Sequence, residues 1–490
     1  MGTKILVLNH TRMGDLIQTT PLIKELKAME PDCEITMLAN AKFSGILNFA
    51  EGIDEVIPID FVHFRESVGA EPDVLMVYEY FDSLADDLRS RRFEKIVNLS
   101  HSKFSAMLSL LIGAKDIRGF LSTPRGERLI RDPWLLYFST FLGFRKFNRF
   151  NIVDLYMRGA GINSYSGARL SLRPDKEAIK EKMAELGVSD GDVLIGLQAG
   201  ASRRDRRWSP ESFAKVADRL SSSRGAKIVL FGSASEKELG DEVETAMETP
   251  AINLIGKTSL SELAAWVDRV DLLVTNDTGT MHIAAAVETQ IVALFFVHAR
   301  AEETGPYCEG AYILQADIEC APCSHRTACD HYSCLTYIDP EDVIAVCEAI
   351  LDNGTVISDD PGLFKRTRVL KSGFHEDGGI EFVPMSRKPL DKHELFAYLY
   401  RPIFNEAASR WSDPDGMSRS GELVDKAISK IADRFLIPQA KDLKVWLTRA
   451  EAGCQTLIQL GQKGAEIASM VALSSASQDS KGLSEIAQEL

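Results

Sequence analysis

Short apolar runs alternate with amphipathic stretches along the first 350 residues. In residues 1–170 the strand-like runs are 4–9, 34–39, 55–59 and 95–99, and residues 192–350 add 193–198, 227–232, 252–256, 271–275 and 291–295. Helical periodicity separates them, and such alternation predicts parallel sheets that are covered by helices on both faces. The pattern therefore predicts an α/β protein with two doubly wound, Rossmann-like domains facing a cleft. Ligands of such domains bind where strands end.

The pattern changes after residue 352. The predicted domains are 1–175 and 190–352, and 353–390 reads as a linker because it is rich in glycine, proline and charge. Residues 391–490 contain no convincing strand. Helical periodicity appears there at 391–410, 419–436 and 440–470, which predicts an α-helical extension to which the sequence assigns no role.

The most informative turn follows the strand-like run 271–275. Asp277, Thr278 and Gly279 precede a predicted helix, 279–286, that carries His282 one turn from its start. Free backbone N–H groups and a positive dipole end make a helix start a site for anions, above all phosphate. The alternative is an ordinary helix, capped by Asp277 or Thr278, that happens to contain a histidine.

A second turn of this kind follows the first strand-like run. Met13 and Gly14 lead into a predicted helix whose first turn contains Asp15. A carboxylate placed there could remove a proton from a sugar hydroxyl as a general base. Alternatively, Asp15 is an acidic residue that the helix dipole stabilises.

Two more turns follow the run 193–198 and the run 227–232. The first passes through Ala201 and Ser202 and then carries four arginines within five residues, which suits a phosphate ligand or a solvated basic loop. The second brings Glu236 to a helix start, where it could bind ribose hydroxyls or be a plain first-turn glutamate.

Charge and composition exclude some classes of protein. The net charge of −15 argues against a general nucleic-acid partner, since no excess of basic residues is available to neutralise phosphates. No apolar run reaches the length of about 18 residues that a membrane span needs, and the first residues lack a secretory pattern. We therefore expect a cytoplasmic protein with reduced cysteines, apart from any bound to metal.

Four of the eight cysteines lie within 15 residues, at Cys320, Cys323, Cys329 and Cys334. His325 and His331 lie among them. The spacing suits a structural zinc or iron ion held by the four cysteines, or by three of them and a histidine, but it lacks the second CxxC pair of a zinc ribbon. Redox-active or disulfide-bonded cysteines and a simple packed segment are the alternatives.

Together the four turns resemble glycosyltransferase family 9, the heptosyltransferases, over residues 3–350. The resemblance rests on Met13-Gly14-Asp15, on Gly200 to Arg206-x-Trp208, and on Asp277-Thr278-Gly279-x-x-His282. It implies a GT-B glycosyltransferase that moves heptose from ADP-heptose to the inner core of lipopolysaccharide. It also implies inversion at the anomeric carbon and no cofactor for catalysis.

The resemblance also assigns roles to single residues. Asp15 matches the family's proposed catalytic base, and Arg206 stands where a lysine usually contacts the donor phosphates. The remaining donor-binding residues implied by the resemblance are Ala201, Ser202, Thr278 and Gly279 at the diphosphate, Glu236 at the ribose, Lys257 at the adenine edge, Asp277 at the sugar and His282 beside the diphosphate.

The first domain is expected to hold the acceptor, a lipid-linked glycan at the inner membrane face. Basic and aromatic residues that suit such an acceptor are Arg118, Arg125, Arg128, Arg131, Arg145, Lys146, Arg149, Trp134, Tyr137, Phe138 and Phe141. A surface helix with ordinary charges explains them equally well. A protein or another glycan as acceptor, and a non-catalytic nucleotide-sugar-binding scaffold, are the rival functions. The sequence does not predict the oligomeric state.

Overall fold

The computed structural model describes most of the chain up to residue 409. The described residues are 2–61, 74–140, 145–163, 168–323, 329–354, 356, 362–385 and 392–409. The chain divides into two compact units, one made of Met1–Leu142 with Phe150–Ser386 and the other of Gly143–Arg149 with Arg387–Leu490. Both predicted Rossmann-like domains therefore lie within the first unit.

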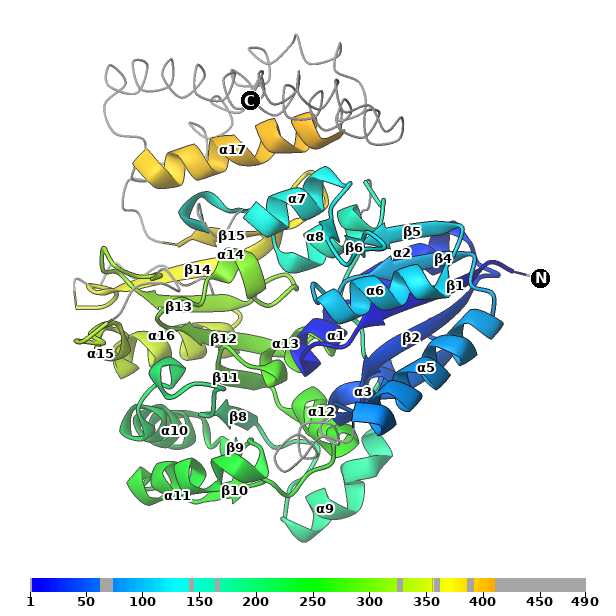
Figure 1. Ribbon diagram of the computed structural model, residues 1–490. Coiled ribbons are helices and arrows are strands. Elements are labelled where there is room, and N and C mark those ends of the chain that lie inside the picture. Colours follow the sequence, from blue (N-terminus) through cyan, green and yellow to red (C-terminus); the bar gives the residue numbers. More distant parts are fainter. Residues whose placement is uncertain are drawn as a thin grey trace. The chain divides into compact units, whose positions relative to one another are not determined.

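The first domain contains a five-stranded sheet in the order β3-β2-β1-β4-β5, and its strands are parallel (Figure 1). The strands are β1 (Lys4–Asn9), β2 (Glu34–Asn40), β3 (Glu55–Ile59), β4 (Lys95–Asn98) and β5 (Asp116–Gly119). The helices α1 (Met13–Ile17), α2 (Thr20–Met29), α3 (Ala41–Ser44), α5 (Val74–Ser90), α6 (Lys103–Ile112), α7 (Pro133–Thr140) and α8 (Ile152–Gly159) belong to the same domain. The strand order reverses between β1 and β4, where a doubly wound sheet opens for a ligand.

The second domain contains an eight-stranded sheet in the order β10-β9-β8-β11-β12-β13-β14-β15. Its parallel strands are β8 (Leu194–Gln198), β9 (Lys227–Leu230), β10 (Ala251–Asn253), β11 (Leu272–Asn276), β12 (Gln290–Phe295) and β13 (Tyr312–Ala316). The main helices are α10 (Pro210–Arg224), α11 (Lys237–Ala246), α12 (Leu260–Arg269), α13 (Gly279–Ala286) and α16 (Pro340–Leu351). The order reverses between β8 and β11, so this sheet has its own switch point. The predicted α/β class is confirmed.

The prediction of a linker at 353–390 was wrong for its middle part. Residues 367–384 form two antiparallel strands, β14 (Thr367–Phe374) and β15 (Ile380–Pro384), which extend the second sheet beyond β13. The apolar residues Leu370 and Phe382 are buried, as in any sheet with one covered face. The glycines and charges that suggested a linker form the hairpin turn, where the His375 N–H donates to the Gly379 carbonyl at 2.8 Å.

The second unit contains the start of the predicted helical extension, α17 (Lys392–Ser409). Within this unit the Arg401 guanidinium donates to the Arg149 carbonyl at 2.9 Å, and the Arg149 guanidinium stacks on the Tyr398 ring. The segment 143–149, expected in the first domain, thus groups with α17. The rest of the helical prediction falls on 410–490, outside the described residues. None of the described helices has the length and hydropathy to cross a membrane.

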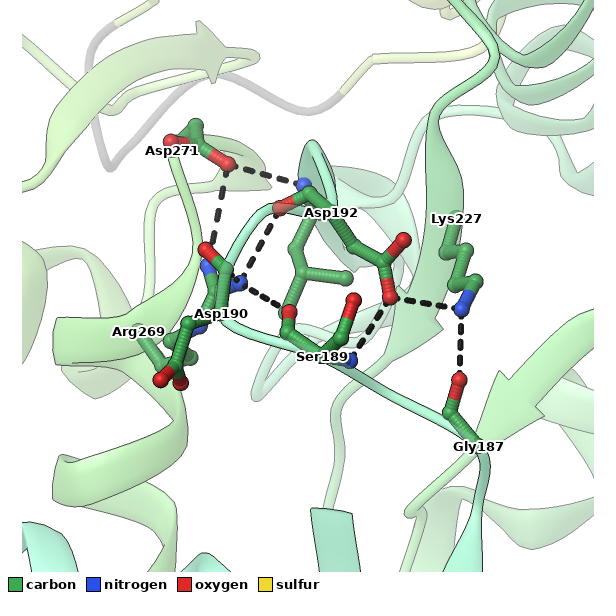
Figure 2. Close-up of polar contacts among 8 residues, drawn as sticks. Gly187, Ser189, Asp190, Asp192, Lys227, Arg269 and Asp271 are labelled. Carbon is green, nitrogen blue, oxygen red and sulfur yellow. Dashed lines mark hydrogen bonds and ion pairs between the residues drawn. The ribbon is translucent and has the colours of Figure 1, made fainter. Parts of the chain in front are cut away.

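The chain enters β8 through a loop that is fixed at the amino end of the second sheet. In Figure 2 the Arg269 guanidinium donates to the carbonyl oxygens of Ser189, Asp190 and Asp192 at 2.9, 3.2 and 3.0 Å. The Lys227 ammonium donates to the Asp192 carboxylate at 2.6 Å, and this pair lowers the pKa of Asp192 to about 2. These contacts fix the start of β8 and leave its carboxyl end for a ligand.

Candidate functional site

The first switch point places Asp15 at the carboxyl end of β1. Asn9, the last residue of β1, is fully buried and its amide donates to the Asp15 carbonyl at 3.1 Å and to Thr19 Oγ1 at 2.8 Å. These bonds fix the turn into α1. The Arg12 backbone N–H donates to Asp15 Oδ2 at 3.2 Å, as expected for an acid in the first turn of a helix. This contact supports the interpretation of Asp15 as an acidic residue that is stabilised at the start of a helix.

The electrostatics of Asp15 also suit a proton acceptor. Burial raises its pKa, and the Arg12 N–H and the Thr11 hydroxyl lower it to a smaller extent. His101, three residues after β4, interacts with the Asp15 charge from the other side of the switch point. A carboxyl with a raised pKa is a more effective general base near neutral pH than an ordinary aspartate. The stabilising and the catalytic interpretations are therefore compatible.

The second switch point places Asp277 and the start of α13 at the carboxyl end of β11. Thr278 is the residue before α13 and has extended backbone angles (φ −142°, ψ 169°), but its side chain does not cap the helix. Instead its hydroxyl lies 3.2 Å from Thr275 Oγ1. Of the two candidate caps, Asp277 or Thr278, the side chain of Thr278 does not cap the helix. The first N–H groups of α13 are therefore left without a cap from the Thr278 side chain, which suits an anion.

Arg206 lies beside Asp277 at this switch point. Its Nη1 is 3.2 Å from Asp277 Oδ2, and both side chains are only about 15% exposed. Burial raises the pKa of Asp277, whereas the charges of Arg206 and Arg12 lower it. The negative charge of Asp15 raises the pKa of Asp277 further. Charged groups of both domains therefore lie within electrostatic range of one another.

Two other arginines of the turn after β8, Arg203 and Arg207, have separate partners. Arg203 pairs with Asp205 at 2.9 Å, and Arg207 donates twice to the Ala201 carbonyl, at 3.0 and 2.8 Å. Ala201 is buried, whereas Ser202 and Arg204 are exposed. The expected cluster of four arginines thus reduces to one inward-facing guanidinium, that of Arg206.

Asn276 joins the turns after β8 and β11. Its amide nitrogen donates to the carbonyls of Ala199 at 2.7 Å and Gly200 at 3.3 Å. Its oxygen accepts from the Trp208 backbone N–H at 3.3 Å. One buried amide therefore provides hydrogen bonds to backbone groups at both ends of the turn after β8, as buried polar groups require.

Glu236 and Lys257 lie in the next two turns of the sheet. Glu236 accepts from the N–H and hydroxyl of Ser233 at 2.8 and 2.9 Å, which forms a capping box and agrees with its interpretation as a first-turn glutamate. Its other oxygen lies so close to Gly200 that a larger residue at that position would have to displace the Glu236 side chain. The Lys257 ammonium donates to the Asn253 carbonyl at 2.9 Å. Both side chains therefore support their own turns, and only Glu236 also reaches the turn after β8.

Helices α1 and α13 bring the two switch points together. A Cβ added to Gly14 would lie 2.7 Å from the ring of His282, and Met13 lies against Gly279. His282 is 5% exposed, and burial lowers its pKa to about 4. Its Nδ1 is buried and has no hydrogen-bond partner among the described residues. The ring is therefore neutral near pH 7 and can donate a hydrogen bond but contributes no charge.

Two histidines near these switch points were absent from the predicted site. His101 follows β4, and His298 follows β12, where the Arg206 Nη2 donates to His298 Nε2. Both lie at carboxyl ends of strands, and this position is the sequence signal that could have identified them as site residues. Neither turn contains the glycine that marked the other four, although the turn after β12 continues into Arg300, Glu302 and Glu303.

The cysteine-rich segment lies beside the turn after β12. The Cys323 N–H donates to the Val297 carbonyl at 2.7 Å, and the Val297 N–H donates to Cys334 Sγ. All four cysteines of the segment have free thiols. Among the residues that the structure describes, no three histidine, cysteine or carboxylate side chains are grouped to hold a metal ion. His325 lies outside the described residues, so a ligand set that includes it stays a prediction.

The expected basic and aromatic surface for an acceptor is only partly present. Trp134 and Tyr137 are buried and pack against Phe150, while Arg149 is buried in the second unit. Aromatic rings in an amphipathic helix were expected at the surface, but here they form a core. The basic residues that remain exposed are Arg118, Arg125, Arg128 and Arg131 in the first unit and Lys146 in the second, whereas Arg145 is buried. Phe141 lies outside the described residues.

Comparisons with known proteins identify what this chain resembles. The family model of glycosyltransferase family 9 (heptosyltransferase) matches residues 81–332. Lipopolysaccharide heptosyltransferase 2 of Salmonella typhimurium is 26% identical over 307 residues, which cover 60% of this chain and 82% of the relative.

Two solved structures share the fold. The family 9 glycosyltransferase of Veillonella parvula has a TM-score of 0.59 at 26% identity, over 72% of this chain and 98% of its own. The Escherichia coli ADP-heptose lipopolysaccharide heptosyltransferase II has a TM-score of 0.53 at 22% identity, over 72% and 99%. The expected GT-B architecture is therefore confirmed.

Proposed function

Because this chain belongs to glycosyltransferase family 9 and is a glycosyltransferase, we propose that it transfers heptose from ADP-heptose to a lipopolysaccharide core. The observation that carries the proposal is the meeting of the two switch points. Asp15 stands at one, and Arg206, Asp277 and the uncapped start of α13 stand at the other. A base and an anion site at adjoining strand ends suit transfer from a sugar diphosphate to a hydroxyl.

In the proposed reaction, the oxygen of an acceptor hydroxyl attacks the anomeric carbon of heptose. A new carbon–oxygen bond forms while the bond from that carbon to the diphosphate oxygen breaks. Asp15 takes the hydroxyl proton, and ADP leaves with the bonding electron pair. Attack from the face opposite the leaving group inverts the anomeric configuration. The raised pKa of Asp15 supports its role as the base.

We propose that the charge on departing ADP is held by Arg206 and by the first N–H groups of α13. A guanidinium and a helix start together provide positive charge and hydrogen-bond donors for a diphosphate. His282 would add one neutral hydrogen bond, since burial lowers its pKa to about 4. Because the protein itself supplies this positive charge, we propose that the transfer needs no metal or other cofactor.

The remaining donor contacts follow the family resemblance. Ala201, Ser202, Thr278 and Gly279 would approach the diphosphate through backbone groups, and Asp277 would contact the sugar while it holds Arg206. Glu236 would bind the ribose with the oxygen that faces Gly200. We place Lys257 at the adenine edge through its backbone, because its ammonium already bonds to Asn253.

The acceptor would be a lipid-linked glycan, met by a cytoplasmic protein that lies peripherally at the inner membrane face. The exposed arginines Arg118, Arg125, Arg128 and Arg131 support a phosphorylated acceptor at the first domain. His101 interacts electrostatically with both Asp15 and Arg128. It therefore lies between the proposed base and the exposed arginines.

The test combines the full-length protein with ADP-heptose and a heptose-deficient lipopolysaccharide core. We expect release of ADP that depends on the core, together with a mass increase of the core by one heptose. Core-independent release would assign hydrolysis instead. Transfer to a protein or to another glycan, but not to the core, would overturn the acceptor, and failure to bind any ADP-sugar would overturn the donor.

A further inference from the structure

The guanidinium of Arg206 is held from two sides by protein groups. Nη1 lies 3.2 Å from Asp277 Oδ2, and Nη2 donates to His298 Nε2. The order of strands explains the arrangement, because β8, β11 and β12 are neighbours in the sheet. The strands β8, β11 and β12 lie side by side in Figure 1. Arg206 follows β8, Asp277 follows β11 and His298 follows β12, and their side chains meet beyond these three strand ends.

The chemistry of the pair fixes the role of the histidine. A guanidinium has five N–H donors and no acceptor, so a hydrogen bond to Arg206 requires an unprotonated nitrogen on the histidine ring. His298 Nε2 is then the acceptor. Asp277 supplies the countercharge and His298 supplies direction, and together they leave the remaining N–H groups of the fork for a ligand.

The turn that carries His298 is itself held in an uncommon conformation. Val297 has φ +55°, a left-handed backbone angle that β-branched residues rarely adopt. Its carbonyl accepts from the Cys323 N–H at 2.7 Å, and its N–H points to the Cys334 sulfur. Such a conformation persists where the surroundings determine it, and here the cysteine-rich segment supplies those surroundings.

We propose that His298 is a positioning residue for the donor diphosphate, which it serves by orienting Arg206, and that the cysteine-rich segment supports it through Val297. This inference rests on the proposed ADP-sugar donor. Without the acceptor at Nε2, the Arg206 side chain keeps its bond to Asp277 among the described contacts and can turn toward that carboxylate. The diphosphate then meets a guanidinium that is no longer held in one orientation.

The experiment measures ADP binding by calorimetry and donor kinetics on full-length variants. His298→Leu removes the acceptor and should weaken ADP binding by about tenfold or more, a loss typical of one hydrogen bond to a charged group. His298→Gln can place its amide oxygen near the position of Nε2 and should restore binding to within about threefold. The donor KM should rise in His298→Leu more than kcat falls, because the change acts on binding of the diphosphate.

A matched control is His375→Leu, at the hairpin turn between β14 and β15, which should bind ADP like the wild type. The support through Val297 is tested by Cys334→Ala, alone and with His298→Leu. If Cys334 acts through His298, the double variant will lose less affinity for ADP than the sum of the losses in the two single variants. A thermal unfolding scan of each variant separates loss of folded protein from loss of affinity.

The outcomes distinguish the two proposals. If the wild type binds no ADP, the proposed donor is wrong. If the wild type binds ADP and folded His298→Leu binds it equally well, His298 does not position Arg206. Failure of His298→Gln to bind better than His298→Leu would also overturn the role of the acceptor, and fully additive losses would overturn the support by Cys334.

Discussion

Gly14 of the first domain lies so close to the His282 ring of the second that a Cβ at Gly14 would stand 2.7 Å from Cδ2 of the ring. The contact joins the helix that carries the proposed base to the helix that starts at the proposed diphosphate site. Neither residue can be enlarged or moved without a shift of the other. The close approach of the two switch points therefore requires that residue 14 has no side chain, as in glycine.

Substitution of Gly14 by alanine is expected to separate the two helices. Overpacking at such a contact costs about 1–3 kcal/mol in the free energy of unfolding, and a small displacement of the base should reduce transfer sharply. Urea unfolding and turnover of ADP-heptose measure the two effects. Gly191→Ala is the control, since an added Cβ there meets no atom within 4 Å. Equal activity of the two variants would show that the contact does not set the geometry.

Asp15→Asn should remove the base while it keeps an acceptor for the Arg12 N–H. We expect kcat to fall by roughly 10²–10⁴, with ADP binding unchanged. In the wild type the base must be ionised, so kcat/KM should rise with pH through the raised pKa of Asp15 and then level off. The variant should lack this rise. A pH profile of transfer for both proteins checks the assignment, and an unchanged kcat would refute it.

Acid should destabilise the protein through His282. Its pKa is about 4 in the folded state, below the ordinary value of 6.5, so the unfolded chain binds the proton first as pH falls. The stability contributed above pH 6.5 is therefore lost between there and about pH 4, by up to roughly 3 kcal/mol. Urea unfolding of the wild type and of His282→Leu at several pH values isolates this contribution. Parallel pH profiles for the two proteins would contradict the prediction.

Loss of the Asn276 amide should loosen the turn after β8. Asn276→Ala leaves the Ala199 carbonyl and the Trp208 N–H without their partner, which costs about 1–3 kcal/mol for each buried group. Calorimetry should show weaker ADP binding as well. Asn40→Ala in the first domain removes a cap from α3 and should cost some stability but no ADP affinity. If both variants bound ADP alike, the turn would not depend on Asn276.

Arg269→Ala should expose the loop before β8 without affecting the site. The guanidinium donates to three carbonyls of this loop, at the amino end of the sheet. We expect faster limited proteolysis near residues 187–192 and a lower melting temperature, with the affinity for ADP retained. A large loss of ADP affinity would mean that the loop communicates with the carboxyl ends of the strands.

The local features of the site could be predicted because local sequence dictates them. The apolar runs of β1, β8 and β11 are long enough to be buried on both faces, and turns such as Met13-Gly14-Asp15 follow them directly. The position of Glu236 at a helix start likewise follows from the turn after the run 227–232. Each of these predictions needs only a few consecutive residues.

The partners of these residues could not be predicted in the same way. The contact between Arg206 and His298 depends on β12 lying next to β11 and β11 next to β8, an order that no short stretch encodes. Arg203, Arg206 and Arg207 look alike in the sequence, yet only the folded turn determines which of them faces Asp277. The strands β14 and β15 were missed because their hairpin turn has the composition of a linker.

The pairing of β14 with β13 has a practical consequence for anyone who shortens this protein. A fragment that stops near residue 352, where the family resemblance ends, would lack both added strands and would leave the fully buried β13 with an unpaired backbone edge. Exposed, apolar strand edges of this kind pair with the strands of other molecules. Such a fragment should therefore aggregate, whereas one that continues through Pro384 should remain monodisperse.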